Sequence, residues 1–261
     1  MQLGISTAAF YGRWETEEAA AQISALPVDC AEVFLQSKSE YKPRFAHIVR
    51  EKLGCMPCTS IHPLGEHENF LIRRSKRQMA DALDSFRQIL DSGAVLGAQT
   101  YVYHGRHTSL LTPIDWDLDW NIEVLNMMCQ EAAQRGMVIG WENVYWCQLT
   151  EPMRVLEAKK HLPQVRFTLD IKQAMRSDCD PIEFAAAMGE QLCNVHVCDW
   201  YANGKLCLPG EGVFDFDKLF DVLNEMGYHG PVILEPYLSL IRDDEALLRS
   251  LDYLRSVMKS K

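Results

Sequence analysis

The chain has 261 residues, 48% of them hydrophobic, and a formal net charge of −10 at pH 7. This length suits one domain with a single large core, and the acidic balance disfavours nucleic acid as a partner, because surfaces that bind nucleic acid are usually basic. Nine cysteines at irregular spacings indicate reduced thiols rather than a disulfide framework. With neither a secretory signal pattern nor an apolar run of about 20 residues, the sequence predicts a cytoplasmic protein that does not enter membranes.

Strand-like and helix-like patterns alternate from the first residues onward. Thr16 is expected to cap the first helix, whose first turn is acidic. Apolar side chains from Ile72 to Leu90 recur at spacings of three, four and seven, which predicts one long helix. In the N-terminal half the expected strands are residues 3–7, 30–35, 57–63 and 100–105, and the expected helices are residues 17–23, 44–53, 68–91 and 121–134.

The C-terminal half repeats the same alternation. Pro152 and Pro181 each stand near the start of an expected helix, where proline is favoured. The expected strands are residues 138–142, 165–170, 192–197 and 231–235. Helices are expected after Thr150 and over residues 182–188, 216–226 and 243–258. A glycine-rich loop is expected at residues 203–212. Eight strands alternating with eight helices predict a parallel sheet covered by helices. We therefore expect an α/β protein made of one (β/α)8 TIM barrel over residues 1–261, a fold that typically takes about 250 residues.

Four of the apolar runs each carry a metal-ligand side chain at or near the end. These side chains are Glu142, Asp170, His196 and Glu235. In a TIM barrel the chemistry lies at the carboxyl ends of the strands, and side chains on inward faces converge on the axis. Three carboxylates close together repel one another unless a cation neutralises them. The sequence therefore predicts one divalent ion, with oxygen and nitrogen ligands that suit Mn, Mg, Co or Zn.

The alternative to a metal is a ring of ion pairs. Lys172, Lys205 and Arg106 lie close enough in sequence to the four strand ends to neutralise the carboxylates. The residues alone leave this alternative open.

Two further histidines, His62 and His104, follow the third and fourth expected strands. Their position at the same end of the barrel predicts contact with a substrate or with a second metal. His107 is close by but belongs to the loop.

Aromatic side chains are concentrated in the loops after the strands. Trp14, Trp116, Trp120, Trp146 and Trp200 all lie in such loops, and tyrosines accompany them. Aromatic loops at one end of a barrel would form a closed pocket that packs against the faces of a sugar. Ordinary anchoring of the loops explains some of these residues as well.

The sequence resembles the xylose isomerase-like TIM-barrel superfamily. The resemblance rests on Glu142, Asp170, His196 and Glu235 at the ends of strands five to eight, on His-Val-Cys-Asp at 196–199 and on Leu-Pro-Gly-Glu-Gly at 208–212. It spans the chain and is strongest to the sugar phosphate isomerase/epimerase branch, which includes ketose 3-epimerases of the tagatose/psicose type. It implies that the four residues hold one divalent metal, and that Glu142 and Glu235 also move protons at the carbon beside a carbonyl, through an enediolate.

The chain departs from that pattern at two places. Gln173 stands where many members have His, three residues after the aspartate of strand six, and Lys205 and Leu206 occupy a region that often holds Arg. Gln173 can bind a hydroxyl but cannot take a proton. We expect His62, His104, Gln173 and Lys205 to orient hydroxyls or a phosphate, with Trp14 and Trp116 among the aromatics around the substrate.

Two other functions of the same fold compete with a sugar isomerase or epimerase. An abasic-site DNA nuclease like endonuclease IV would use three zinc ions, but Gln173 replaces one of its histidines and its Asp-x-His motif is absent between Trp200 and Gly212. A metal-dependent dehydratase or lyase, or a relative without catalytic activity, is the other alternative. The expected partner is a small sugar or sugar phosphate, and the sequence leaves a homo-oligomer open.

Overall fold

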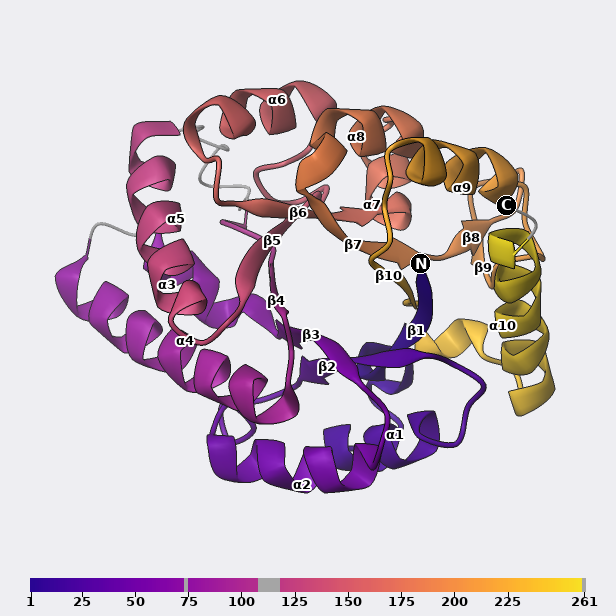
Figure 1. The fold of residues 1–261 in the computed structure, drawn as a ribbon, viewed down its shortest axis with the longest axis horizontal. Helices are drawn as coiled ribbons and strands as arrows, with labels where there is room; N and C mark the ends of the chain where they lie inside the picture. Colours follow the sequence, from indigo (N-terminus) through magenta and orange to yellow (C-terminus); the bar gives the residue numbers. More distant parts are fainter. Residues whose placement is uncertain (73–74, 108–117, 260–261) are drawn as a thin grey trace.

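The barrel predicted from the sequence is present in the computed structural model, which describes residues 1–72, 75–107 and 118–259. Trp116, expected near the substrate, lies outside the described residues. Within these ranges eight parallel strands close in the order β1-β10-β7-β6-β5-β4-β3-β2, and helices surround them (Figure 1). The strands are β1 (Gln2–Ser6), β2 (Cys30–Leu35), β3 (Cys58–Pro63), β4 (Thr100–Tyr103), β5 (Val138–Glu142), β6 (Arg166–Asp170), β7 (Leu192–Val197) and β10 (Pro231–Leu234).

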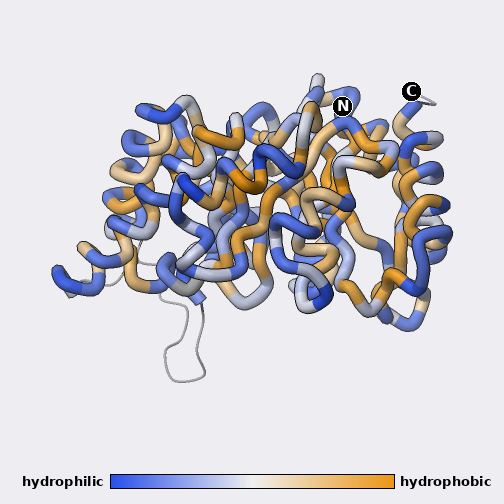
Figure 2. The backbone as a smooth tube through the Cα atoms, turned by 90° about the horizontal axis from the view of Figure 1, so that it is seen from below, coloured by the Kyte–Doolittle hydropathy of each residue, from blue (hydrophilic) through white to orange (hydrophobic). Residues whose placement is uncertain are grey.

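The outer layer consists of helices that bury one face against the strands. They are α1 (Thr16–Ile23), α2 (Pro43–Leu53), α3 (Glu68–Leu71), α4 (Lys76–Leu96), α5 (Leu118–Ala133), α6 (Pro152–His161), α7 (Ile171–Arg176), α8 (Pro181–Met188), α9 (Phe216–Glu225) and α10 (Asp244–Lys259). The strands are largely hydrophobic and the outer turns hydrophilic (Figure 2). Among the described residues no helix is both long and apolar enough to span a bilayer.

Two details of the predicted helices are wrong. Thr16 does not cap α1; Glu15 occupies the cap and forms a reciprocal capping box with Glu18. Thr16 is buried instead, and its hydroxyl donates to the Glu40 carboxylate. The single helix expected over residues 68–91 is two helices, α3 and α4. Ser75 adopts an extended backbone before α4, as a residue that caps a helix does.

Two short elements at the barrel mouth were not predicted. α7 begins directly after β6, and a hairpin of β8 (Asp199–Trp200) and β9 (Leu206–Cys207) lies within the glycine-rich loop. Both elements follow strands that carry predicted site residues. They therefore help to shape the site rather than the barrel wall.

Neighbouring strands are closely packed and paired in a defined register. Trp141 and Phe167 are fully buried and paired in register between β5 and β6. A side chain at Gly140 would place its Cβ 2.7 Å from the Thr168 hydroxyl, so only glycine fits there without a shift. In the next pair of strands Asp170 stands opposite His196. The register thus brings the last residues of neighbouring strands to one level.

Candidate active site

Glu142, Asp170, His196 and Glu235 meet at the carboxyl ends of the strands. One ligand atom from each lies within 4.8 Å of those of the other three. Glu142, Asp170 and His196 are 1% exposed and Glu235 is 9% exposed. The structure therefore brings together the four residues that the sequence singled out. Their role as metal ligands remains a prediction.

Three atoms of this group are buried without a hydrogen bond. They are Glu142 Oε2, Asp170 Oδ2 and His196 Nδ1, and none has a hydrogen-bond partner of suitable geometry in the described parts of the chain. Ionisable groups do lie beside them: His104 is 3.0 Å from Glu142 Oε2, Lys172 is 3.4 Å from Asp170 Oδ2, and His196 Nδ1 is 3.5 Å from Glu142 Oε1. Buried polar atoms without partners are costly, and most have one in native proteins. Two carboxylate oxygens and one ring nitrogen that face the same small space match the donor set of a divalent ion. The residues present therefore fit a metal.

Glu32 on β2 was missed at the sequence level, and it holds both buried histidines. Its carboxylate is fully buried, accepts from the Ser60 hydroxyl at 2.6 Å and lies 2.9 Å from His196 Nε2 and 3.3 Å from His62 Nδ1. An ionised carboxylate only accepts, so the Nε2 atom of His196 donates and Nδ1 is left with the lone pair when the ring is neutral. A second-layer carboxylate commonly sets the tautomer of a metal-binding histidine in this way.

His62 and His104 lie between the carboxylates. Their Nε2 atoms are 2.7 Å apart, so one ring donates to the other. His62 Nδ1 is 3.4 Å from Glu235 Oε1, and His104 Nε2 is 3.0 Å from Glu142 Oε2. Burial opposes a charge on His62, but hydrogen bonds to Glu235 and Glu32 raise its pKa to about 10. His62, His104 and Glu142 could also hold a metal. The Nε2 atoms of His62 and His104 are hydrogen-bonded to each other. They are therefore less available to an ion than His196 Nδ1, which has no hydrogen bond among the described residues.

Lys172 shows that the ion-pair alternative is partly present. Its ammonium group lies 3.2 Å from Glu235 Oε2 and 3.4 Å from Asp170 Oδ2, and its side chain is 5% exposed. Lys205, named with it at the sequence level, is exposed in the turn between β8 and β9. Lys172 is therefore a buried cation beside two of the four predicted ligands.

A cavity of about 260 Å³ opens over this group. The residues that line it are Ala8, Tyr11, Phe34, His62, Leu64, His104, Glu142, Trp146, Lys172, Gln173, Glu235, Pro236 and Tyr237. This volume is just below the roughly 300–1,000 Å³ that is usual for small-ligand pockets, so the cavity suits a small ligand. Gln173 is buried and its Oε1 has no hydrogen-bond partner among the described residues.

Of the predicted substrate contacts, His62, His104 and Gln173 line the cavity, whereas Trp14 and Lys205 are not among its described lining residues. Trp14 packs against Phe10 with ring centroids 5.0 Å apart. Trp146 lines the cavity, as the concentration of loop aromatics suggested, and aromatic and aliphatic side chains form much of its wall.

Comparison with known proteins decides the family. A family model described as "Xylose isomerase-like TIM barrel" matches residues 20–257. The chain belongs to this family. The resemblance found in the sequence is thereby confirmed, and so is the predicted (β/α)8 fold.

Solved structures with the same fold superpose along nearly the whole chain. A D-psicose 3-epimerase is 17% identical, covers 99% of both chains and has a TM-score of 0.83. The 3-keto-D-glucoside 4-epimerase YcjR from E. coli is 18% identical, covers 99% of both chains and has a TM-score of 0.75. At such identities the likeness shows the fold alone.

A curated relative matches only part of the chain. A 3-dehydroshikimate dehydratase from Pseudomonas aeruginosa is 26% identical over 147 residues, which is 51% of this chain and 23% of that protein. The match therefore spans less than a quarter of that relative.

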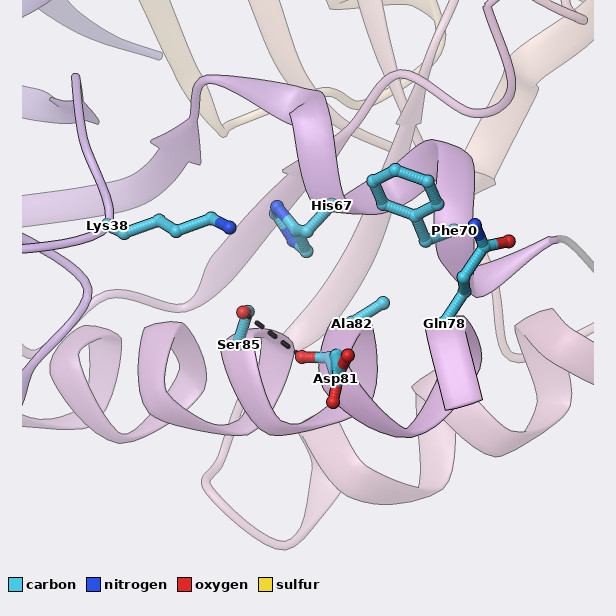
Figure 3. A pocket seen from close by; sticks show the side chains of 7 residues that line it. All are labelled: Lys38, His67, Phe70, Gln78, Asp81, Ala82 and Ser85. Carbon is cyan, nitrogen blue, oxygen red and sulfur yellow. Dashed lines mark hydrogen bonds between the residues drawn. The ribbon is translucent and has the colours of Figure 1, made fainter. Parts of the chain in front are cut away.

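A second cavity, of about 210 Å³, is lined by other residues and lies beside α4 (Figure 3). His67 faces it from the turn before α3, and Asp81 and Ser85 face it from α4. Burial lowers the pKa of His67 to about 4, so the ring is neutral, and its Nε2 lies 2.8 Å from the Tyr101 hydroxyl.

Behind Tyr101 the contacts continue to the active site. The Tyr101 hydroxyl donates to Glu68, and Glu68 accepts the backbone N–H of His104 at 3.0 Å. Burial raises the pKa of Glu68 to about 7. Glu68 therefore anchors the strand end that presents His104. It was included in an expected helix at the sequence level, where nothing marked it as a site residue.

Replacing Glu32 by Gln should weaken metal binding by roughly 10–100-fold, the usual effect of losing a second-layer carboxylate. The amide cannot accept from His196 and His62 as the carboxylate does, so His196 Nδ1 is no longer fixed as the free atom. Titration of the metal-free variant with Mn²⁺ by calorimetry measures the effect. Glu225→Gln, an exposed change at the end of α9, is the control. Equal affinities in Glu32→Gln and Glu225→Gln would contradict the assignment.

Proposed function

We propose that the chain is an isomerase or epimerase that depends on one divalent metal and acts on a keto sugar or sugar phosphate. The observation that carries the proposal is the position of Glu142 and Glu235. Both line the cavity, they come from β5 and from the residue after β10, and each belongs to the group that could hold a metal. Two carboxylates on different sides of one small pocket allow a proton to be removed and returned by separate groups.

Glu142, Asp170, His196 and Glu235 would hold the ion, because one ligand atom from each lies within 4.8 Å of the others. When bound, a divalent ion supplies Lewis acidity that polarises a carbonyl oxygen and stabilises negative charge that develops on it. One of Glu142 and Glu235 would take the proton from the carbon beside the carbonyl, which leaves an enediolate. The other would return a proton to that carbon or to its neighbour.

The remaining lining residues would orient the substrate. His62, His104 and Gln173 offer hydrogen bonds to hydroxyl groups. Tyr11, Phe34, Trp146 and Tyr237 form the apolar part of the wall, which would exclude water and pack against the sugar. Solved structures with the same fold give further support, because they include D-psicose 3-epimerases and a 3-keto-D-glucoside 4-epimerase.

Metal analysis and isotope exchange test the proposal together. The purified chain should contain or bind close to one divalent ion. With Mn²⁺ and a panel of ketohexoses and their phosphates in deuterated water, at least one sugar should gain deuterium beside its carbonyl, and chelation should stop the exchange. Absence of exchange from every sugar, with metal bound, would argue against this reaction.

A dehydratase is the second candidate, favoured by the partial match to the 3-dehydroshikimate dehydratase. Both reactions begin with removal of a proton beside a carbonyl, but a dehydratase then expels water. Mass spectrometry separates them, because an epimer keeps the mass of its substrate apart from deuterium, whereas a dehydrated product is lighter by one water. Three bound zinc ions with cleavage of abasic DNA would instead indicate the nuclease.

A further inference from the structure

The position of Lys172 has a consequence for metal binding. Lys172 is the second residue of α7, and its ammonium group reaches back over the end of β6. It contacts Glu235 Oε2 at 3.2 Å, the Glu235 backbone carbonyl at 3.3 Å and Asp170 Oδ2 at 3.4 Å. On the remaining side it lies 5.1 Å from the centre of the Tyr237 ring. Carboxylates, a carbonyl and an aromatic face therefore surround the cation.

Lys172 shares two carboxylates with the proposed metal. Asp170 and Glu235 belong to the four-residue group whose ligand atoms lie within 4.8 Å of one another. An ion held by that group would lie within a few ångströms of the ammonium group. Like charges at such separations repel strongly in a buried site, where solvent does not screen them. The lysine and the ion therefore oppose each other.

The other members of the group are differently placed. Glu142 Oε2 and His196 Nδ1 have no hydrogen-bond partner in the described ranges, and no described cation other than a histidine lies in ion-pair contact with Glu142. The lysine thus occupies the Asp170–Glu235 side of the site, whereas the described groups in ion-pair contact with Glu142 are histidines.

We propose that Lys172 is an internal counter-cation, which neutralises Asp170 and Glu235 when the metal is absent and competes with the metal for them. The proposal rests on the function proposed above, because it presupposes a divalent ion at this site. The competition makes metal binding reversible, and weaker than it would be if the carboxylates had no lysine beside them. It also makes the metal-free barrel stable, since two of its buried carboxylates are already paired.

Lys172→Met tests both consequences, because methionine keeps much of the length and apolar surface of lysine without its charge. We expect Mn²⁺ to bind the variant roughly 10-fold or more tightly than the wild type, since a nearby like charge has been removed. We expect the metal-free variant to melt at a lower temperature than the metal-free wild type, since Asp170 and Glu235 lose their cation. Calorimetric titration with Mn²⁺ alone and thermal melts with and without Mn²⁺ give the two readouts.

Two companion variants make the result specific. Lys205→Met removes an exposed lysine from the same end of the barrel and should change neither readout. Lys172→Gln keeps a hydrogen-bond donor without the charge, and it serves if the methionine variant does not fold. Equal or weaker Mn²⁺ binding by both Lys172 variants, while the wild type binds Mn²⁺, would overturn the competition alone. Failure of every variant and of the wild type to bind Mn²⁺ would overturn the proposed function and, with it, the competition.

Discussion

Glu142→Gln and Glu235→Gln should each slow the exchange of solvent deuterium into a true substrate by ~10²–10⁴-fold, the usual contribution of a positioned acid or base. Both carboxylates line the cavity and are almost fully buried, so each would face a bound substrate rather than solvent. Glutamine keeps the shape of the side chain but cannot accept a proton. The loss should therefore appear in the exchange rate of substrate-saturated protein, with less effect on the substrate concentration needed for saturation.

Metal occupancy must be measured beside the exchange rate, because both residues also belong to the proposed ligand set. The comparison is made at Mn²⁺ concentrations that load each variant. Glu225→Gln, on the exposed end of α9, is the control and should exchange at the wild-type rate. Exchange that persists in a metal-loaded double variant would remove both residues from proton transfer while leaving the metal site intact.

The barrel could be predicted because its strands are short apolar runs and because proline marks the start of helices such as those at Pro152 and Pro181. The four candidate metal ligands could be predicted from the same strands, because each lies at or near the end of an apolar run. A charged or ionisable side chain at the end of a buried strand is unfavourable unless something compensates it, and this holds separately for Glu142, Asp170, His196 and Glu235. Their convergence then follows from strand alternation alone.

Glu32 escaped prediction because it lies in the middle of a strand rather than at its end. Its sequence neighbours, Ala31 and Val33, are apolar, and its partners come from two other strands: Ser60 and His62 on β3, and His196 on β7. A lone carboxylate within an apolar strand was the available signal. Which partners satisfy it depends on the register of the closed barrel, which the sequence does not state.

α7 could have been predicted from local chemistry. Asp170 caps this helix by accepting the backbone N–H of Gln173 at 2.9 Å through Oδ1, while Oδ2 has no hydrogen-bond partner among the described residues. An aspartate followed three residues later by glutamine is a helix-start pattern. One carboxylate thus begins a helix with one oxygen and faces the candidate metal site with the other. The same helix brings Lys172 to the site. Its position in the sequence alone did not decide whether its ammonium group forms an ion pair or faces solvent.

Two motifs that are separate in the sequence, His-Val-Cys-Asp at 196–199 and Leu-Pro-Gly-Glu-Gly at 208–212, form one unit in the fold. The aspartate of His-Val-Cys-Asp is Asp199. Its carboxylate accepts hydrogen bonds from four backbone N–H groups, which belong to its own hairpin, to the Leu-Pro-Gly-Glu-Gly stretch and to the residues after that stretch. The four donors are the N–H groups of Trp200 at 2.7 Å, Gly210 at 3.2 Å, Gly212 at 3.0 Å and Phe214 at 3.1 Å. A Cβ at Gly212 would overlap the Asp199 carboxylate, which explains the glycine.

Asp199→Ala should therefore lower the free energy of unfolding by about 3–5 kcal/mol, because four backbone donors around a buried position lose a charged acceptor at once. Denaturation by urea, monitored by tryptophan fluorescence and by circular dichroism, measures the loss. Asp215→Ala is the matched control in the same loop. Asp215 caps α9 through a single exposed bond to the Lys218 N–H, so its removal should cost only about 1 kcal/mol. If the two variants were equally stable, Asp199 would not hold the loop, and the hairpin over this end of the barrel would depend on packing by Trp200 and Phe214 instead.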